Sequence, residues 1–285
     1  MKQIKLLFLL ASASVTGAFA QSNGLTDMSQ SRYAKMANTG IDAVHWTNGF
    51  WGERFNVFSG TSLQSMWNTW NTPEVSHGFR NFEIAAGVCK GEHWGPPFHD
   101  GDMYKWMEGV ASVYAVNKDP ELDKLMDNFI ACVVKAQRAD GYIHTPVVIE
   151  ELNKGIDSHT LADSQQQTVI GTKVGSEDEK GAFANRLNFE TYNLGHLMMA
   201  GIVHHRATGK TTLLDAAVKA TDFLCHFYET ASAELARNAI CPSHYMGVVE
   251  MYRATGNPRY LELSKNLIDI RGMVESGTDD NQDRI

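Results

Sequence analysis

A short turn between two helix-forming segments occurs twice in this sequence. Arg206–Lys210 carries the order Arg-Ala-Thr-Gly, and the same order returns about 47 residues later at Arg253–Asn257. Val116–Pro120 is a weaker copy of the same turn. Glycine suits such a turn because it accepts a positive φ without a steric penalty. A helical hairpin repeated at this period predicts a solenoid or an α/α toroid, because one hairpin alone cannot bury both of its faces.

Apolar residues recur at helical spacing on both sides of these turns. The clearest stripe covers residues 122–134, and Asp119 and Pro120 before it form a good N-cap and first turn. Tyr142–Ile149 is the best candidate for a short strand. Further helices are predicted at residues 104–116, 194–205, 213–224, 244–253 and 260–270. Roughly six or seven helices of ordinary length make three or four hairpins. The sequence therefore predicts an all-α fold of the (α/α)6-toroid type, present incompletely.

The N-terminus has the pattern of a secretory signal peptide. A basic start at Met1–Lys5 precedes the apolar run Leu6–Ala13 and a small-x-small site at Ala18–Ala20. We therefore expect export to the periplasm or the extracellular space. No other stretch is apolar enough to span a membrane. The expected organisation is a signal peptide (1–20), a loop-rich N-terminal segment (21–60), a partial (α/α) barrel (61–272) and a polar tail (273–285), with a long polar surface loop at 153–181.

The charge and the cysteines narrow the function classes. The formal net charge is −8, which argues against a nucleic-acid partner. Four cysteines in a chain of 285 residues are too few for a disulfide scaffold. Cys132 lies on an apolar stripe and is expected to be a buried free thiol, whereas a Cys225–Cys241 bridge stays open.

Three polar clusters lie at the starts of predicted helices, at residues 96–104, 190–196 and 243–250. Equivalent ends of successive hairpins face one opening in a toroid, so these clusters are expected to converge on one pocket. Asp100 and Asp102 are open to two interpretations: either caps a helix, or it binds sugar hydroxyls. The aromatic residues around them, such as Trp94 and Trp106, are open to the same choice between the core and a sugar-stacking surface.

The clusters do not select a catalytic pair or a metal site. Most glycosidases use two carboxyl groups that flank the scissile bond, and the candidates are Asp100, Asp102, Glu190 and Glu250. Zinc requires three or four convergent ligands, and no such pattern of spacing is present. We therefore expect no metal ligands in this chain.

Several segments resemble the β-L-arabinofuranosidase family, glycoside hydrolase family 127. The stretch Asp100–Glu108 is similar to its "D-x-D-x-Y-K-W-x-E", and Ala139–Ile143 to its "Q-x-x-D-G-Y". Glu190–Leu197 matches its "E-x-Y-x-x-G-H-L", and the turn at Ala207–Lys210 fits the hairpin that follows. The resemblance extends over most of residues 40–272 and is carried by the motifs together.

This resemblance implies an (α/α)6 catalytic barrel that acts on plant-glycan side chains. Members use a zinc-bound cysteine nucleophile in "E-T-C" and "C-C" segments, and neither segment occurs in this sequence. We therefore expect zinc in a full-length relative, no cofactor in this chain, and catalytic residues beyond residue 285. The resemblance places part of the sugar pocket at His196 and, more loosely, at His244, where the family has "G-H-x-E". The expected substrate-binding residues are Asp102, Glu190, Tyr192, His196 and His244.

The leading hypothesis is an exported, truncated family-127-like hydrolase whose partner is an oligosaccharide or a polysaccharide. One alternative is a helical sugar-binding or interaction module without catalysis. Another is a different (α/α)6 enzyme, a lyase or an unsaturated-uronyl hydrolase, that uses Asp102 with a histidine. The oligomeric state is left open by the sequence.

Overall fold

The computed structural model describes residues 24–29, 31–156, 183, 188–231 and 243–272. The predicted signal peptide, most of the polar loop at 153–181, Cys241 and the polar tail lie outside these residues. No helix in the described part is long and apolar enough to cross a membrane.

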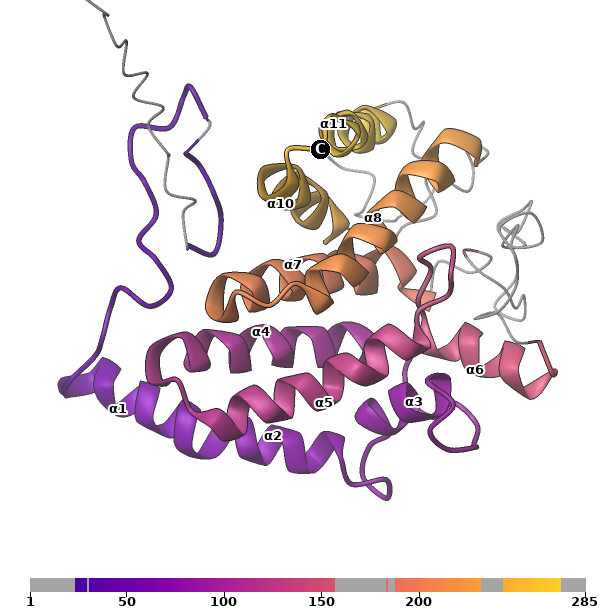
Figure 1. Cartoon of the computed structure of the whole chain (residues 1–285), viewed down its shortest axis with the longest axis horizontal. Coiled ribbons are helices and arrows are strands. Elements are labelled where there is room, and N and C mark those ends of the chain that lie inside the picture. The colour runs from indigo at the N-terminus through magenta and orange to yellow at the C-terminus, as the bar shows by residue number, and fades with distance from the viewer. Residues whose placement is uncertain (1–23, 30, 157–182, 184–187, 232–242, 273–285) are drawn as a thin grey trace, which may run out of the picture.

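The described residues fold into helices and contain no strand (Figure 1). The first helical run is continuous, because a π-helical turn, η1, joins α1 to α2. The helices are α1 (Gly49–Val57), η1 (Phe58–Ser62), α2 (Leu63–Trp70), α3 (Gly78–Ala85), α4 (His99–Asn117), α5 (Pro120–Ala136), α6 (Thr145–Asn153), α7 (Glu190–Thr208), α8 (Thr212–Thr230), α10 (His244–Thr255) and α11 (Pro258–Gly272). The all-α prediction is confirmed.

Helices α4, α7 and α10 form a row of parallel neighbours (Figure 1). At the start of α4, the Gly101 N–H donates to Asn193 Oδ1 near the start of α7 (2.8 Å). At their far ends, Lys118 Nζ donates to the Ala207 carbonyl (3.0 Å). The two helices therefore run in the same direction. Gly195 places the first turns of α7 against the backbone of His244 at the start of α10.

Helices α5, α8 and α11 return antiparallel to this row and complete three hairpins. The turns of the last two hairpins use glycine with positive φ, 78° at Gly209 and 71° at Gly256. Lys118 takes the same left-handed conformation in the first hairpin, with a φ of 54°. Asp119 caps α5 by accepting from the Glu121 N–H, and Pro120 begins the helix. The hairpin repeat and this cap were both predicted, and the structure confirms them.

Aromatic rings between α3, α4 and α5 form the centre of the first hairpin's core. Phe129 is fully buried and packs against the rings of Phe82, Tyr104 and Trp106. Cys132 is buried on the same helix and is a free thiol, as predicted. This core packs against α4, which also carries the polar residues described below.

The N-terminal strap, residues 24–29 and 31–48, crosses the far ends of the row without regular secondary structure. Arg206 of α7 donates to the carbonyl oxygens of Gly24 (3.0 Å) and Leu25 (2.8 Å). The Asp27 N–H donates to Glu250 of α10 (3.2 Å). Glu250, one of the predicted catalytic candidates, therefore lies at the strap and is almost fully buried.

The structure corrects two details of the predicted secondary structure. The strand expected at Tyr142–Ile149 is wrong, because helix α6 begins at Thr145. Pro146 occupies the first turn of that helix, and the buried run Val147–Ile149 has no period of two to separate strand from helix. The second correction is that α1 begins at Gly49, inside the segment expected to be loop-rich.

Candidate functional site

Five side chains from the first halves of α4 and α7 form a connected polar cluster. Lys105 pairs with Asp102 one turn earlier on α4 (Nζ–Oδ1 2.8 Å) and donates to the Tyr192 hydroxyl of α7. The Tyr192 ring contacts His196 edge-on, at 4.7 Å between ring centroids. His196 Nδ1 lies 3.8 Å from the Glu108 carboxylate on α4. We call Asp102, Lys105, Glu108, Tyr192 and His196 the polar cluster.

Helical spacing explains why these residues meet. Asp102, Lys105 and Glu108 are three residues apart and share one face of α4, and Tyr192 and His196 are four apart on α7. Burial disfavours the charged form of Lys105, but its hydrogen bonds to Asp102 and Tyr192 outweigh this and raise its pKa. Lys105 is therefore a fixed cation within reach of solvent, with 42% of its side chain exposed.

A pocket of about 450 Å³ lies beside the polar cluster, between α4 and the η1–α2 segment. Asp102 and Lys105 form its polar part, and Trp70 and the almost fully buried Trp106 are its largest aromatic lining residues. The remaining lining residues are Phe58, Leu63, Met66 and Gly109. A pocket with aromatic surface and a few polar groups suits a sugar ring, which has apolar faces and hydroxyls at its edge.

Asp100 serves the fold rather than the polar cluster. Its carboxylate accepts from the Thr145 N–H (2.7 Å) and hydroxyl (2.6 Å), which attaches the start of α6 to α4. It is 2% exposed. His144 Nδ1 is 3.5 Å away and is also fully buried. Asp100 does not cap α4, since the start of that helix has no side-chain cap.

Glu190, a predicted substrate-binding residue, points into the protein. It accepts from the Tyr142 hydroxyl and from the Phe183 N–H (2.8 Å), and it is almost fully buried. Burial raises its pKa, although His144 and the bonds from Tyr142 and Phe183 act in the opposite direction. The structure therefore does not bring Glu190 into the polar cluster.

His244, the remaining predicted residue, is fully buried at the start of α10. Its ring stacks with Tyr228 of α8, and its Nε2 lies 3.4 Å from the Tyr228 hydroxyl. The neighbouring Ser243 hydroxyl donates to the Tyr192 carbonyl (2.9 Å). His244 therefore lies beside the first turn of α7, whose exposed face carries Tyr192 and His196.

Of the five predicted residues, Asp102, Tyr192 and His196 are brought together, while Glu190 and His244 are buried behind them. Sequence reasoning missed Lys105 and Glu108. Their signal was present, because both lie in the stretch Asp100–Glu108 at a spacing of three from Asp102.

The described residues do not fit a zinc site. No group of three His, Cys, Asp or Glu side chains in this part of the chain lies close enough to hold a metal ion. Cys89, Cys132 and Cys225 lie on separate elements, and burial raises the pKa of each thiol. A cysteine binds zinc as the thiolate, which a raised pKa disfavours.

Parallel inner helices, antiparallel outer helices and a polar cluster at one end of the row define an all-α protein built of α/α hairpins, as in a toroid. A family model described as "Beta-L-arabinofuranosidase, GH127 catalytic domain" matches residues 43–285. The chain belongs to this family.

Named relatives agree with this family. The non-reducing end β-L-arabinofuranosidase of Bifidobacterium longum subsp. longum is 32% identical over 197 residues, which cover 69% of this chain and 27% of that protein. A solved glycoside hydrolase is 74% identical with a TM-score of 0.64, and the match covers 93% of this chain and 32% of that one. A GH127 β-L-arabinofuranosidase from Geobacillus stearothermophilus T6 is 30% identical with a TM-score of 0.64. That match covers 81% of this chain and 33% of the Geobacillus protein. The chain spans about a third of the length of these relatives.

Proposed function

We propose that this chain forms part of the carbohydrate pocket of a β-L-arabinofuranosidase-type glycoside hydrolase, and that the polar cluster binds a terminal arabinofuranosyl residue. The observation that carries the proposal is the linkage of Asp102, Lys105, Tyr192 and His196 beside an aromatic-lined pocket. The names of the Bifidobacterium and Geobacillus relatives supply the sugar class.

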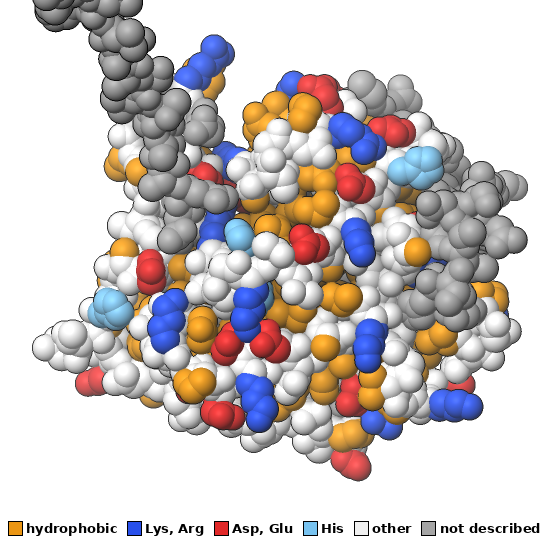
Figure 2. Space-filling model, in the orientation of Figure 1, with side chains coloured by type: hydrophobic (Ala, Val, Ile, Leu, Met, Phe, Trp, Pro, Cys, Tyr) orange, Lys and Arg blue, Asp and Glu red, His pale blue; other side chains and the backbone are white. Residues whose placement is uncertain are grey.

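The chemistry of the cluster suits a neutral polyol. Asp102 and Glu108 offer acceptors, Lys105 and Tyr192 offer donors, and His196 provides one or the other according to its tautomer. Figure 2 shows charges of both signs interspersed over the visible face of the molecule. Such a surface does not present the broad cationic field that binds polyanions. We also propose that the protein is exported and that it acts on plant glycans.

Isothermal titration of the 285-residue chain with methyl β-L-arabinofuranoside tests the proposal. We expect saturable binding that His196→Ala weakens at least tenfold. His226→Ala is the matched control, because His226 is exposed on the outer helix α8, and it should bind like the wild type. Absence of saturable binding by the wild type, or equal affinity in both variants, would contradict the proposal.

A turnover assay separates the competing functions. Release of nitrophenol from 4-nitrophenyl β-L-arabinofuranoside, lost in His196→Ala, would establish hydrolysis. Binding without release would favour the non-catalytic sugar-binding module. Turnover of an unsaturated uronide that Asp102→Asn abolishes would favour the lyase or uronyl-hydrolase alternative.

A further inference from the structure

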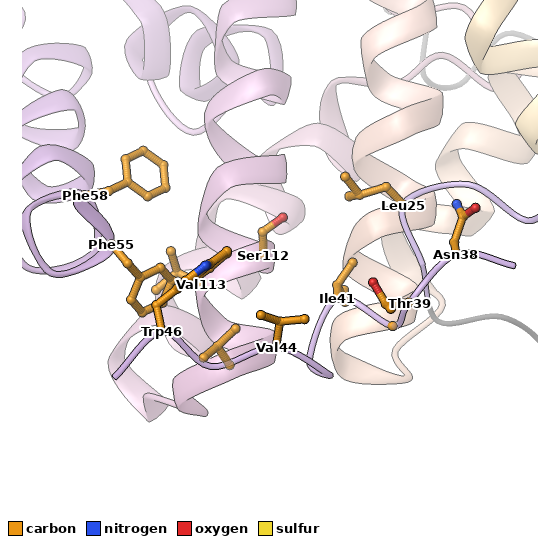
Figure 3. Close-up of a pocket in the computed structure, with 12 residues that line it drawn as sticks. Leu25, Asn38, Thr39, Ile41, Val44, Trp46, Phe55, Phe58, Ser112 and Val113 are labelled. Carbon is orange, nitrogen blue, oxygen red and sulfur yellow. The ribbon is translucent and has the colours of Figure 1, made fainter. Parts of the chain in front are cut away.

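Trp46 and Trp94 are both about half exposed, but their surroundings differ. Trp46 of the strap (46% exposed) lines a groove of about 620 Å³ whose lining residues include no charged side chain and no imidazole (Figure 3). Trp94 (50% exposed) lies in the connection between α3 and α4, and the His77 ring contacts it edge-on at 4.9 Å. Recognition of a sugar requires an apolar surface together with directional hydrogen bonds. Of the two tryptophans, Trp94 therefore has the surroundings that suit a sugar.

Hydrogen bonds and a tight turn hold the chain around Trp94. The fully buried Asn81 of α3 accepts from the Trp94 N–H (3.3 Å) and donates to the Trp94 carbonyl oxygen (3.1 Å). Gly95 follows with a φ of 104°, and a Cβ there would lie 2.7 Å from the His99 ring. Because the backbone is fixed on both sides, a ligand binds Trp94 without the entropic cost of ordering a loop.

Three histidines in this region have ring nitrogens without a protein partner. His77 Nδ1, His93 Nε2 and His99 Nδ1 are buried and make no hydrogen bond. Within the described part of the chain, the second nitrogen of each ring also has no hydrogen-bond partner, and it is not buried. Buried polar groups without partners are uncommon in folded proteins. Three of them in one region indicate a role other than stability.

The environment of these histidines favours uncharged rings. Burial lowers the pKa of His93 to about 4, although Asp100 acts in the opposite direction. Burial also lowers the pKa of His99. The charges of His77 and His99 act on His93, so the three rings share one region, but they do not converge closely enough to hold a metal ion. At neutral pH, an uncharged imidazole offers a donor or an acceptor to a hydroxyl rather than a positive charge to an anion.

This region adjoins the polar cluster through α4 and Trp70. His99 lies three residues before Asp102, on the same face of α4. Trp70 contacts the His99 ring edge-on at 5.5 Å, and it also lines the pocket that contains Asp102 and Lys105. A glycan with its terminal residue at the polar cluster therefore has this region beside its next residue.

We propose that Trp94, His77, His93 and His99 form a second sugar subsite, which binds the neutral sugar to which the terminal arabinofuranosyl residue is attached. The Trp94 ring stacks on the apolar face of this sugar, and the unburied histidine nitrogens bind its hydroxyls. The inference rests on the proposed function, because the polar cluster has to hold the terminal residue. It adds a determinant of linkage and chain length that recognition of a single sugar does not require.

Isothermal titration of the 285-residue chain with ligands of one and two residues tests this subsite. The one-residue ligand is methyl β-L-arabinofuranoside. The two-residue ligands are the methyl arabinobiosides in which a terminal β-L-arabinofuranosyl residue is linked to O2, O3 or O5 of a second arabinofuranose. We expect at least one disaccharide to bind about tenfold more tightly than the monosaccharide.

Matched tryptophan substitutions make the test specific. Trp94→Ala should remove this gain and leave the affinity for the monosaccharide unchanged, whereas Trp94→Phe keeps an aromatic face and should retain most of the gain. Trp46→Ala is the control, because Trp46 is similarly exposed and also contacts one aromatic ring, that of Phe55, at 5.6 Å. It should bind every ligand like the wild type. Circular dichroism checks that the variants fold.

The outcomes separate this inference from the proposed function. If the wild type binds the monosaccharide but no disaccharide more tightly, only the second subsite is refuted. An equal loss for both kinds of ligand in Trp94→Ala, or the same loss in Trp46→Ala, would also overturn it. Disaccharide binding that depends on Trp94 but not on His196 would instead refute the role of the polar cluster and support the subsite. Absence of binding to all of these ligands would overturn both proposals.

Discussion

Gly195 makes the contact between α7 and α10 sensitive to a single carbon atom. An added Cβ would lie 2.4 Å from the His244 backbone nitrogen and 2.5 Å from the Ser243 carbonyl carbon. Both neighbours are backbone atoms, so no side-chain rotation relieves the overlap. Gly195→Ala must therefore push the start of α10 away from α7.

The size of the effect follows from two opposing contributions. Overpacking of a tight contact costs about 1–3 kcal/mol, and replacing a helical glycine by alanine recovers about 0.5–1 kcal/mol. We expect a net loss of about 1–2 kcal/mol in the free energy of unfolding. For a chain of this size, this corresponds to a fall of roughly 2–8 °C in Tm. Separation of the helices should also strain the Ser243–Tyr192 hydrogen bond and weaken sugar binding.

Urea denaturation followed by circular dichroism measures this loss, and Gly60→Ala is the matched control. Gly60 lies in the helical run at η1, without positive φ, and an added Cβ meets nothing within 4 Å. Its substitution should stabilise the protein by about 0.5–1 kcal/mol, since only the backbone entropy of the unfolded chain changes. If Gly195→Ala proves as stable as Gly60→Ala, the close approach of α7 and α10 is refuted.

Asp100→Asn replaces the carboxylate that accepts two hydrogen bonds from Thr145. A urea titration should show a loss of about 2–4 kcal/mol in the free energy of unfolding. An unchanged midpoint would exclude this role for Asp100. The raised pKa of Glu190 means that the folded state holds this proton more tightly than the unfolded state, so its contribution to stability falls as pH rises from the unfolded pKa through the folded one. Glu190→Gln should remove this part of the decline, and stability curves of both proteins that stay parallel over pH 4–8 would contradict it. Phe129→Ala should cost about 3–5 kcal/mol, and Val134→Ala, on the exposed side of the same helix, less than about 1 kcal/mol in the same titration.

The hairpin architecture was predictable because its signals are local. The Asp119-Pro120 cap, the apolar stripe of α5 and the turn glycines each act over a few residues, so reading them requires no knowledge of distant partners. The two matching Arg-Ala-Thr-Gly turns then placed the connections of two of the hairpins in the sequence. These signals predicted that the helices exist, but they did not predict where each helix begins. Helix α4 begins five residues before the predicted start at Tyr104.

The burial of the polar residues depended on partners far away in the sequence. Nothing near Asp100 indicates that Thr145 will supply two donors, and nothing near Glu190 indicates the Tyr142 hydroxyl. The incorrect strand prediction at 142–149 also concealed the roles of Tyr142 and Thr145, because a strand places alternate residues on opposite faces. Long-range hydrogen bonds of this kind decide which carboxylates are buried. Local sequence patterns do not reveal these bonds.

Helical geometry nevertheless separates the candidates once the helix starts are known. Successive residues turn by about 100°, so residues two apart point to nearly opposite sides. Asp100 and Asp102 are such a pair, and so are Glu190 and Tyr192: in each, the first member is buried and the second joins the polar cluster. Sites that face one opening of an α/α toroid must therefore come from a single stripe of each inner helix. On this basis, a substitution at Asp102 or Tyr192 should change sugar affinity with little effect on stability, whereas one at Asp100 or Glu190 should act chiefly on stability.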